Sequence, residues 1–260
     1  MGKVLAITNR KGGTGKTMTS VSLGASLARQ GKKVLVVDAD SQHSATVSLG
    51  VRESDKLAFT LATIMQSVIK EQEIDPTEGI ILHDEGISLM PSNNGLAGME
   101  IVLAGVMGRE TVLRQYIDEV RGLYDYILLD TAPTLDLLAI NALAAADSVI
   151  IPVAPKFLDA KGLELLLKSI AQIRQHINPS LKIGGILLTM VDKRANITKS
   201  IIEMIRNAYG ESISIFKEPI PQSVRAIETS ATGKSIFEHD PKGKVAMAYA
   251  SLAREVLESA

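Results

Sequence analysis

Short apolar runs alternate along this chain with longer segments in which apolar residues recur every three or four positions. The short runs are typical of buried strands, and the longer pattern is typical of amphipathic helices. The strand-like runs cover residues 3–8, 33–38, 124–130, 147–153, 182–190 and 213–216. The helix-like segments cover residues 18–29, 59–69, 108–121, 135–146, 160–176, 197–209 and 243–257. This alternation predicts an α/β fold in which helices cover both faces of a mostly parallel, twisted sheet.

The weakest pattern lies in the segment between residues 51 and 105. Besides the helix at 59–69, residues 79–83 and 87–90 predict either a hairpin or two short strands. The chain has no internal repeat, no low-complexity linker and no break in composition, and 46% of its 260 residues are hydrophobic. One large core is therefore sufficient, and we expect a single domain over residues 1–260.

Glycines gather between the first strand and the first helix, where residues 10–17 read R-K-G-G-T-G-K-T. A strand, a glycine-rich loop and a helix form the layout of a phosphate-binding loop, in which successive backbone N–H groups make a nest for anionic oxygens. Lys16 can reach the β- and γ-phosphates of a nucleotide, and the Thr17 hydroxyl can bind Mg²⁺. The strict pattern needs glycine at position 10, but this chain has Arg10, and Lys11 adds a second positive charge.

Carboxylates follow two other predicted strands. Asp38 and Asp40 stand in the segment D-A-D-S-Q after the second strand, and Asp130 ends the third in D-T-A-P. Ligands of open α/β sheets bind at the carboxyl ends of the strands, so these side chains should meet the glycine-rich loop there. Asp130 after a buried run is typical of a Walker B aspartate, which holds Mg²⁺ through its water ligands. Asp38 can hold the same water shell, and residues 131–133 are expected to sense the γ-phosphate.

The pattern K-G-G-x-G-K-T resembles the deviant Walker A motif of the ParA/MinD family of P-loop ATPases. The segments at 38–42, 130–133, 141–147 and 219–225 resemble further motifs of that family, so the resemblance covers nearly the whole chain. It implies a P-loop NTPase fold and a homodimer in which Lys11 reaches the partner's nucleotide while Lys16 acts in cis. It also implies that Asp40 positions the attacking water and that adenine lies beside Met190, Asp192 and Pro221.

Together, these motifs predict a site for ATP and Mg²⁺. The catalytic residues are expected to be Lys11, Lys16 and Asp40, and the metal-binding residues Thr17, Asp38 and Asp130. The residues expected to bind ATP are Lys11, Gly12, Gly13, Thr14, Gly15, Lys16, Thr17, Met18, Met190, Asp192 and Pro221.

The branch of the family follows from what the chain carries and lacks. It has no cysteine, which excludes the iron-protein branch because that branch holds its cluster with cysteines. The tail at 250–260 has two acidic residues, one basic residue and no aromatic residue, and is a poor membrane anchor. Only ten residues precede the loop, as in the short ParA (Soj-like) proteins. The resemblance therefore implies an ATPase for plasmid or chromosome partitioning, whose hydrolysis is slow until a ParB-type partner stimulates it.

In that family the ATP-bound dimer binds DNA without sequence preference, through phosphate contacts. The expected contacts are Arg225, Lys234, Lys242 and Lys244, with Lys193, Arg194, Lys199 and Arg206 as a second set. Gln222 stands where the family often has arginine. The formal net charge is −1, so any DNA contact must come from a local patch.

Two alternatives remain open. One is a positioning ATPase for a non-DNA cargo, including a MinD-like membrane oscillator, and the other is a metabolic P-loop enzyme such as an ATP-dependent ligase. The lack of cysteine fits a reducing compartment, and no apolar stretch approaches the length of a membrane span. We therefore expect a cytoplasmic, nucleoid-associated protein that does not bind membranes.

Overall fold

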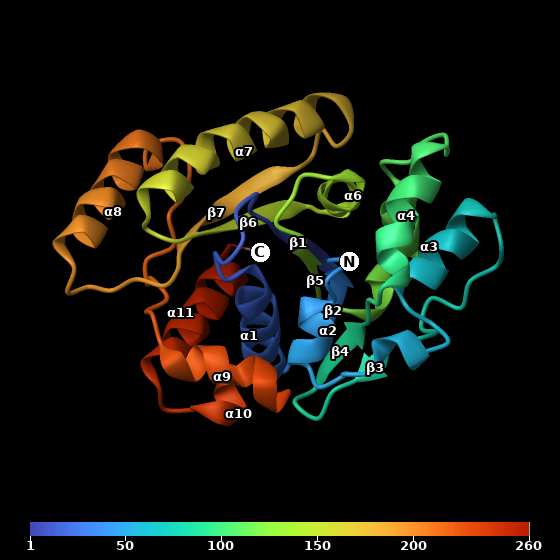
Figure 1. Ribbon diagram of the computed structural model, residues 1–260, viewed down its shortest axis with the longest axis horizontal. Coiled ribbons are helices and arrows are strands. Elements are labelled where there is room, and N and C mark those ends of the chain that lie inside the picture. The colour runs from blue at the N-terminus through green and yellow to red at the C-terminus, as the bar shows by residue number, and fades with distance from the viewer. Residues whose placement is uncertain (260) are drawn as a thin grey trace.

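The computed structural model describes residues 1–259, apart from the side chains of residues 157–161. Its centre is a seven-stranded sheet in the order β3-β4-β2-β5-β1-β6-β7 (Figure 1). The strands are β1 (Lys3–Ile7), β2 (Val34–Ala39), β3 (Ile81–Leu82), β4 (Ile87–Met90), β5 (Tyr126–Thr131), β6 (Ser148–Val153) and β7 (Lys182–Leu188). Only the edge pair β3–β4 is antiparallel among the strand pairs of the described residues. The predicted mostly parallel sheet is confirmed.

Helices cover both faces of this sheet (Figure 1). One face packs against α3 (Leu61–Ile69), α4 (Gly95–Ala104), α5 (Val112–Val120), α6 (Leu137–Ala145), α7 (Phe157–His176) and α8 (Asn196–Tyr209). The other face packs against α1 (Lys16–Arg29), α2 (Ser44–Ser48), α9 (Val224–Thr232), α10 (Ile236–His239) and α11 (Lys244–Glu258). Two 3₁₀ turns, η1 (Ser54–Lys56) and η2 (Arg121–Leu123), complete the described elements.

The central strands are apolar along their whole length because helices bury them on both sides. Every residue of β2, β5 and β6 is buried, which is the environment that favours unbroken Val, Ile and Leu runs over alternation. Helix α1 lies close against this layer at Gly24, where an added Cβ would lie 3.1 Å from Cγ2 of Val36. Such a contact fixes the distance of α1 from the sheet, and with it the position of the loop that precedes the helix.

Several predicted elements differ from the observed ones. The strand predicted at 213–216 is wrong, since this segment pairs with β7 only through the single bridge between Ile186 and Ile215. The helix predicted at 108–121 begins at Val112, because Gly108 adopts a left-handed turn with φ 68°. Of the two interpretations of residues 79–90, the hairpin is confirmed by the antiparallel pairing of β3 and β4.

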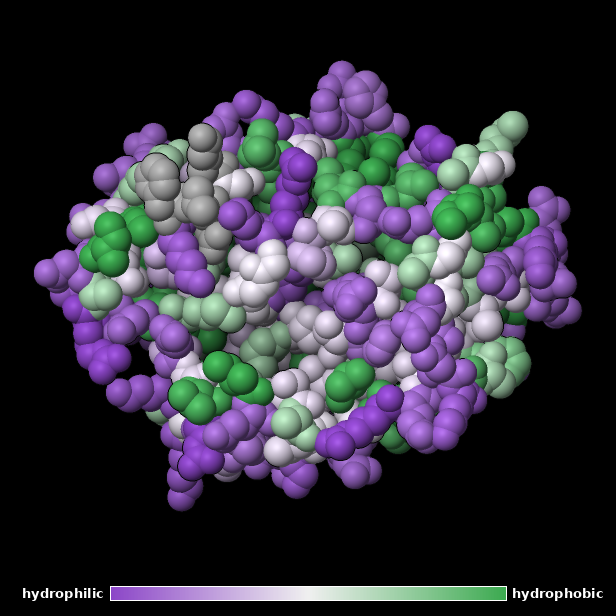
Figure 2. Space-filling view, in the orientation of Figure 1, coloured by the Kyte–Doolittle hydropathy of each residue, from purple (hydrophilic) through white to green (hydrophobic). Residues whose placement is uncertain are grey.

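Helices α2, α4, α9 and α10 were not predicted from the sequence, and α2 and α10 span only five and four residues. Helix α4 is apolar almost all round, so its pattern could not separate an inner from an outer face. Its outer face stays exposed, with Ile101 82% and Met107, just beyond its end, 99% accessible. Figure 2 shows apolar side chains gathered over this part of the molecule, at the right of the view. Within residues 1–259, no helix combines the length and the apolar character needed to cross a membrane.

Candidate nucleotide-binding site

The glycine-rich loop connects β1 to α1 at the carboxyl edge of the sheet. Gly15 immediately precedes the helix and has φ 82°, a left-handed conformation that a residue with a Cβ adopts only with strain. The carbonyl of Thr14 accepts a hydrogen bond of 2.7 Å from the hydroxyl of Thr189, just after β7. The loop is therefore tied to a neighbouring strand end, and the start of α1 points its free N–H groups at the space above the loop.

A second tie fixes the start of the loop. The amide of Asn9 donates to the carbonyl of Pro152 in β6 at 2.7 Å, and its Oδ1 accepts the backbone N–H of Lys11 at 3.0 Å. The Lys16 ammonium donates to the Lys11 carbonyl at 3.2 Å, across the mouth of the loop. Burial lowers the pKa of Lys16, whereas the carboxylates of Asp130 and Asp40 act in the opposite direction. Lys16 is thus a cation held in a largely buried position beside an anion-binding loop.

Two buried aspartates face this loop from adjacent strands. Asp38 in β2 lies opposite Asp130 in β5 in the strand register, and neither is accessible to solvent. Asp130 accepts hydrogen bonds from Thr17 at 2.8 Å and from Ser20 at 2.7 Å. Burial raises the pKa of Asp130, and the charge of Asp38 raises it further. The pKa of Asp38 is also raised, chiefly by burial.

This arrangement fits a hydrated Mg²⁺ ion. Two carboxylates that repel each other in a dry environment favour a divalent cation, and the Thr17 hydroxyl supplies a further oxygen. In the described part of the chain no group of three acidic or histidine side chains forms a closed metal cage. Mg²⁺ suits such an open site because it usually keeps several waters and takes its remaining ligands from phosphate oxygens.

Asp40 stands at the wall of the same site, only 5% accessible. One carboxylate oxygen accepts the backbone N–H of Gln42 at 2.9 Å. Its carbonyl accepts the Ser92 hydroxyl at 2.9 Å, which ties this loop to the end of β4. The carboxylate is thus held in place by backbone contacts, as a group that orients a water molecule must be.

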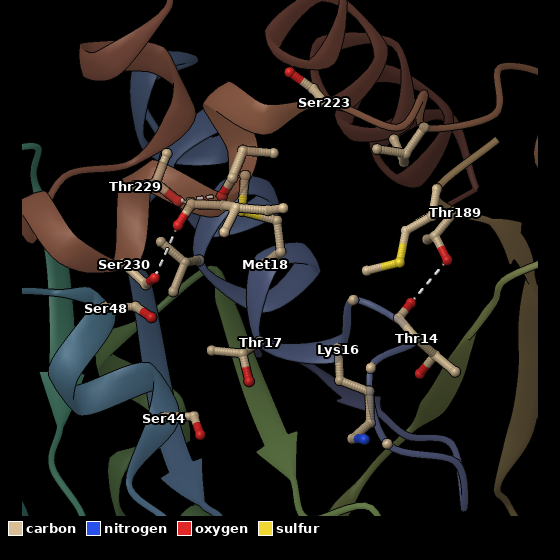
Figure 3. Close-up of a pocket in the computed structure, with 18 of the residues that line it drawn as sticks. Thr14, Lys16, Thr17, Met18, Ser44, Ser48, Thr189, Ser223, Thr229 and Ser230 are labelled. Atoms are coloured by element: carbon tan, nitrogen blue, oxygen red, sulfur yellow. Dashed lines mark hydrogen bonds between the residues drawn. The ribbon is translucent and has the colours of Figure 1, made fainter. Parts of the chain in front are cut away.

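The loop opens into a cavity of about 520 Å³, large enough for a nucleotide. Figure 3 shows Lys16 and Thr17 at its floor, with the hydroxyls of Ser44 and Ser230 on one side. Most of the residues predicted to bind ATP line the cavity, namely Gly12, Gly13, Thr14, Gly15, Lys16, Thr17, Met18, Met190 and Pro221. The residues predicted from the motifs are therefore largely brought together in space.

Asp192 and Lys11 are not among the residues that line this cavity. The Asp192 carboxylate accepts hydrogen bonds from Arg194 at 3.0 and 3.2 Å and faces a neighbouring cleft. Asp192 was expected beside adenine at the β7 strand end, and it lies two residues after Met190, where φ is 53°, in the wall of the neighbouring cleft. Lys11 packs near Gly162 of α7, where an added Cβ would lie 3.6 Å from its Cγ.

The cationic residues predicted to contact DNA do not all line the same cleft. Lys244, Lys193 and Arg194 line the neighbouring cleft, whereas Lys234 lines the nucleotide cavity. Arg225 pairs with Glu228 at 3.2 Å, an exposed contact of small energetic value. The remaining members of the set, Lys242, Lys199 and Arg206, are exposed.

Three functional contacts were missed in the sequence. Ser20 bonds Asp130, and its spacing of three residues from Thr17 on α1 could have indicated a shared partner. Thr46 donates its N–H and its hydroxyl to Asp38, each at 2.7 Å, and accepts the backbone N–H of Ser92 at 2.9 Å. No sequence signal links Thr46 with Ser92, because strand order alone brings them together.

Comparisons with known proteins show the family of this chain. The family model described as AAA domain matches residues 2–183. Sporulation initiation inhibitor protein Soj of Bacillus subtilis is 40% identical over 260 residues, which cover 98% of each chain. The chain belongs to the ParA/MinD family of P-loop ATPases.

Other relatives fit this membership. The chromosome partitioning protein ParA of Myxococcus xanthus is 37% identical, with 99% of this chain and 89% of that protein covered. A crystal structure of cobyrinic acid a,c-diamide synthase from Mycobacterium smegmatis, with bound ADP and magnesium, superimposes with a TM-score of 0.86 at 32% identity. The superposition covers 99% of this chain and 95% of that one. ParA/MinD-type ATPases therefore share both the sequence and the fold of this chain.

Proposed function

We propose that this protein is an ATP-driven dimerisation switch that partitions DNA. The observation that carries the proposal is a phosphate-binding loop with a lysine ahead of its glycines, in a chain whose full length resembles chromosome partitioning ATPases. In this proposal the ATP-bound dimer binds DNA without sequence preference. Hydrolysis of ATP to ADP and phosphate, stimulated by a ParB-type partner, releases it.

The proposal gives each nucleotide-binding residue a role that its contacts support. The backbone of Gly12–Lys16 holds the phosphates, and Lys16 binds the β- and γ-phosphates of its own subunit. Thr17, Asp38 and Asp130 would hold a hydrated Mg²⁺ ion, Thr17 through its hydroxyl and the two aspartates through their carboxylates. Mg²⁺, when bound, offsets the negative charge of the β- and γ-phosphates. The mutual repulsion of the buried carboxylates supports this assignment, because a cation relieves it.

Hydrolysis in this proposal depends on two further residues. Asp40 accepts a hydrogen bond from the attacking water and orients it toward the γ-phosphate. Lys11 of each subunit contacts the partner's nucleotide and stabilises the charge on the γ-oxygens as the bond breaks. The site is complete only in the dimer, so turnover by the isolated subunit is slow. The exposed apolar face of α4 supports a protein–protein contact, since such faces mark interaction sites.

DNA contacts in this proposal come from exposed cations near the carboxyl-terminal part of the chain. Lys244, Lys193 and Arg194 line one cleft and can contact neighbouring phosphates of a duplex. Arg225 and Lys242 extend this set. Because the proposed dimer binds DNA without sequence preference, we also propose that the protein associates with the nucleoid.

A metabolic ligase is the second candidate, because the diamide synthase structure is similar over nearly the whole chain. Its substrate would need a site next to the γ-phosphate. The second large cleft meets the nucleotide cavity at Pro221–Ser223 and includes no residue of the phosphate-binding loop. This placement favours a switch over a ligase.

Measurement of molar mass in solution tests the proposed function. The wild type and Asp40→Ala should form dimers with ATP and Mg²⁺ and remain monomers with ADP, because dimerisation needs the γ-phosphate but not its hydrolysis. Lys16→Ala should stay monomeric in both. A mass that is the same with ATP, with ADP and without nucleotide would contradict the switch.

A further inference from the structure

Lys234 has a position that DNA binding does not explain. It lines the nucleotide cavity, where the charged side chains among the described lining residues are Lys16, Asp40 and Lys234. In residues 1–259, no carboxylate is recorded within ion-pair distance of its ammonium. The cavity therefore carries an excess positive charge, to which the exposed Lys234 contributes. Lys234 also lines the adjoining cleft that contains Glu85 and Glu238.

The segment that carries Lys234 is held by the turn of the β3–β4 hairpin. Glu85 accepts the Ser235 backbone N–H at 2.8 Å and also its hydroxyl. The His83 ring donates from Nε2 to the Gly233 carbonyl at 3.2 Å. Lys234 thus lies between two residues whose backbone groups are both anchored to one hairpin.

Two more contacts hold the end of α9. Arg52 donates to the Ala231 carbonyl at 2.6 Å. Gly233 has φ 70° and lies so close to Gly50 that an added Cβ would be 2.7 Å from its Cα. Backbone this close to backbone cannot shift to accept a side chain, so the turn before Lys234 has a fixed conformation. Four contacts from residues 50–85 thus set the direction in which Lys234 leaves the chain.

The remaining wall around Lys234 is rich in hydroxyls. Ser44, Ser48, Thr229 and Ser230 line the same part of the cavity, and Figure 3 shows them on the side of α2 and α9. A cation beside hydroxyl groups is suited to a phosphate. The hydroxyls of Ser44 and Ser48 can donate to an anionic oxygen, whereas those of Thr229 and Ser230 already donate to the carbonyls of Ala226 and Ile227. Lys234 is exposed, but it also lines the nucleotide cavity, where the phosphates of a bound nucleotide can reach it.

We propose that Lys234 is a nucleotide-binding residue that contacts a phosphate group of bound ATP or ADP, and that Glu85 is its positioning residue. This inference rests on the proposed function, since it takes the cavity to be the ATP site. It moves Lys234 from the DNA surface to the nucleotide site. It also gives the β3–β4 hairpin, far from the phosphate-binding loop in sequence, a part in nucleotide binding.

The test compares Lys234→Ala with Lys70→Ala, which removes an exposed lysine at the end of α3 that lines none of the described clefts. Dissociation constants for fluorescent ATP and ADP are measured by anisotropy, with adenosine as a competitor that has no phosphate. Lys234→Ala should weaken ATP and ADP binding about tenfold, as expected for one charge-assisted hydrogen bond at a partly exposed site. Adenosine affinity should stay within about twofold, and Lys234→Arg should recover most of the loss.

Glu85 is tested in a double-mutant cycle with Lys234. Glu85→Ala should weaken ATP binding in the wild-type background and add little in Lys234→Ala, because it acts only through the lysine. Glu85→Gln should retain most of the affinity, since the amide oxygen still accepts the Ser235 N–H. An equal loss in both backgrounds would show that Glu85 stabilises the fold without positioning Lys234.

DNA binding at saturating ATP separates the two roles of Lys234. Unchanged DNA binding together with weakened nucleotide binding supports the proposal. Unchanged nucleotide affinity overturns it, and if DNA binding falls at the same time, Lys234 belongs to the DNA surface. A wild-type protein that binds no ATP would contradict the proposed function itself, and the wild-type titration alone reveals that outcome.

Discussion

The buried carboxylate pair gives a prediction that needs no ligand. Asp130→Asn removes one of two charges that face each other at the carboxyl ends of β5 and β2. Burial and the charge of Asp38 raise the pKa of Asp130 to about 7. Its unfolded value lies near 3.9. Between these values the folded protein binds more protons than the unfolded chain, so the unfolding free energy of the wild type falls as pH rises.

The magnitude follows from the same two values. One pKa unit is worth about 1.4 kcal/mol. From pH 5 to pH 8 the titration of Asp130 therefore removes about 2 to 3 kcal/mol of stability, and above about pH 8 it removes no more. Asp130→Asn lacks this contribution. The unfolding free energy of Asp130→Asn minus that of the wild type should increase by about 2 kcal/mol between pH 5 and pH 8. Any pH-independent cost of the amide cancels in this change.

Urea denaturation in EDTA at pH 5, 6, 7 and 8 measures this effect. Asp118→Asn, an exposed position on α5, serves as the control and should show a constant difference from the wild type. Added Mg²⁺ and ATP should stabilise the wild type and have little effect on Asp130→Asn, since the cation site is lost. A difference between Asp130→Asn and the wild type that stays flat or shrinks as pH rises would refute the repulsion between the carboxylates.

Three further predictions concern single residues. Lys11→Ala should bind ATP with an affinity within about twofold of the wild type. Its partner-stimulated phosphate release should fall by a factor of at least about 100. Unchanged stimulated turnover would exclude a role for Lys11 in the partner's site. Gly233→Ala should lower the unfolding free energy by about 2 to 4 kcal/mol, from left-handed strain plus the clash with Gly50. Gly31 is also left-handed but has no neighbour within 4 Å of an added Cβ, so Gly31→Ala should lower the unfolding free energy by only about 1 kcal/mol. Equal losses in Gly233→Ala and Gly31→Ala would show that the contact with Gly50 has no effect.

The phosphate-binding half of the site was predictable because it depends on local chemistry. Residues 12–17 and Asp130 are positioned by the strand, turn and helix to which they belong, and each leaves a pattern in the sequence. Asp192, predicted to lie beside adenine, lines the neighbouring cleft and comes two residues after the left-handed Met190. The 231–235 segment was beyond prediction, since contacts with a hairpin about 150 residues away hold it.

The fold shows the same division. The central strands were predicted nearly to their ends because burial on both faces gives unbroken apolar runs. Helix α4 was missed because its exposed face is as apolar as its buried one, and periodicity then carries no information. The strand predicted at 213–216 has the right composition, but only one bridge joins it to β7. The sequence of a segment therefore predicts a strand that is buried on both faces. Whether a segment pairs along the edge of the sheet depends on other parts of the chain, which its own composition does not show.

Binding to random-sequence DNA in three nucleotide states tests the central claim most directly. Anisotropy of a labelled duplex is measured with ATP, with ADP and without nucleotide, for the wild type and Asp40→Ala, over a series of salt concentrations. The account predicts binding only with ATP, a steep loss of affinity with salt, and equal or longer-lived binding by Asp40→Ala because hydrolysis is the release step. DNA affinity that is the same with ATP, with ADP and without nucleotide, or no DNA binding in any of these states, would contradict the proposed switch.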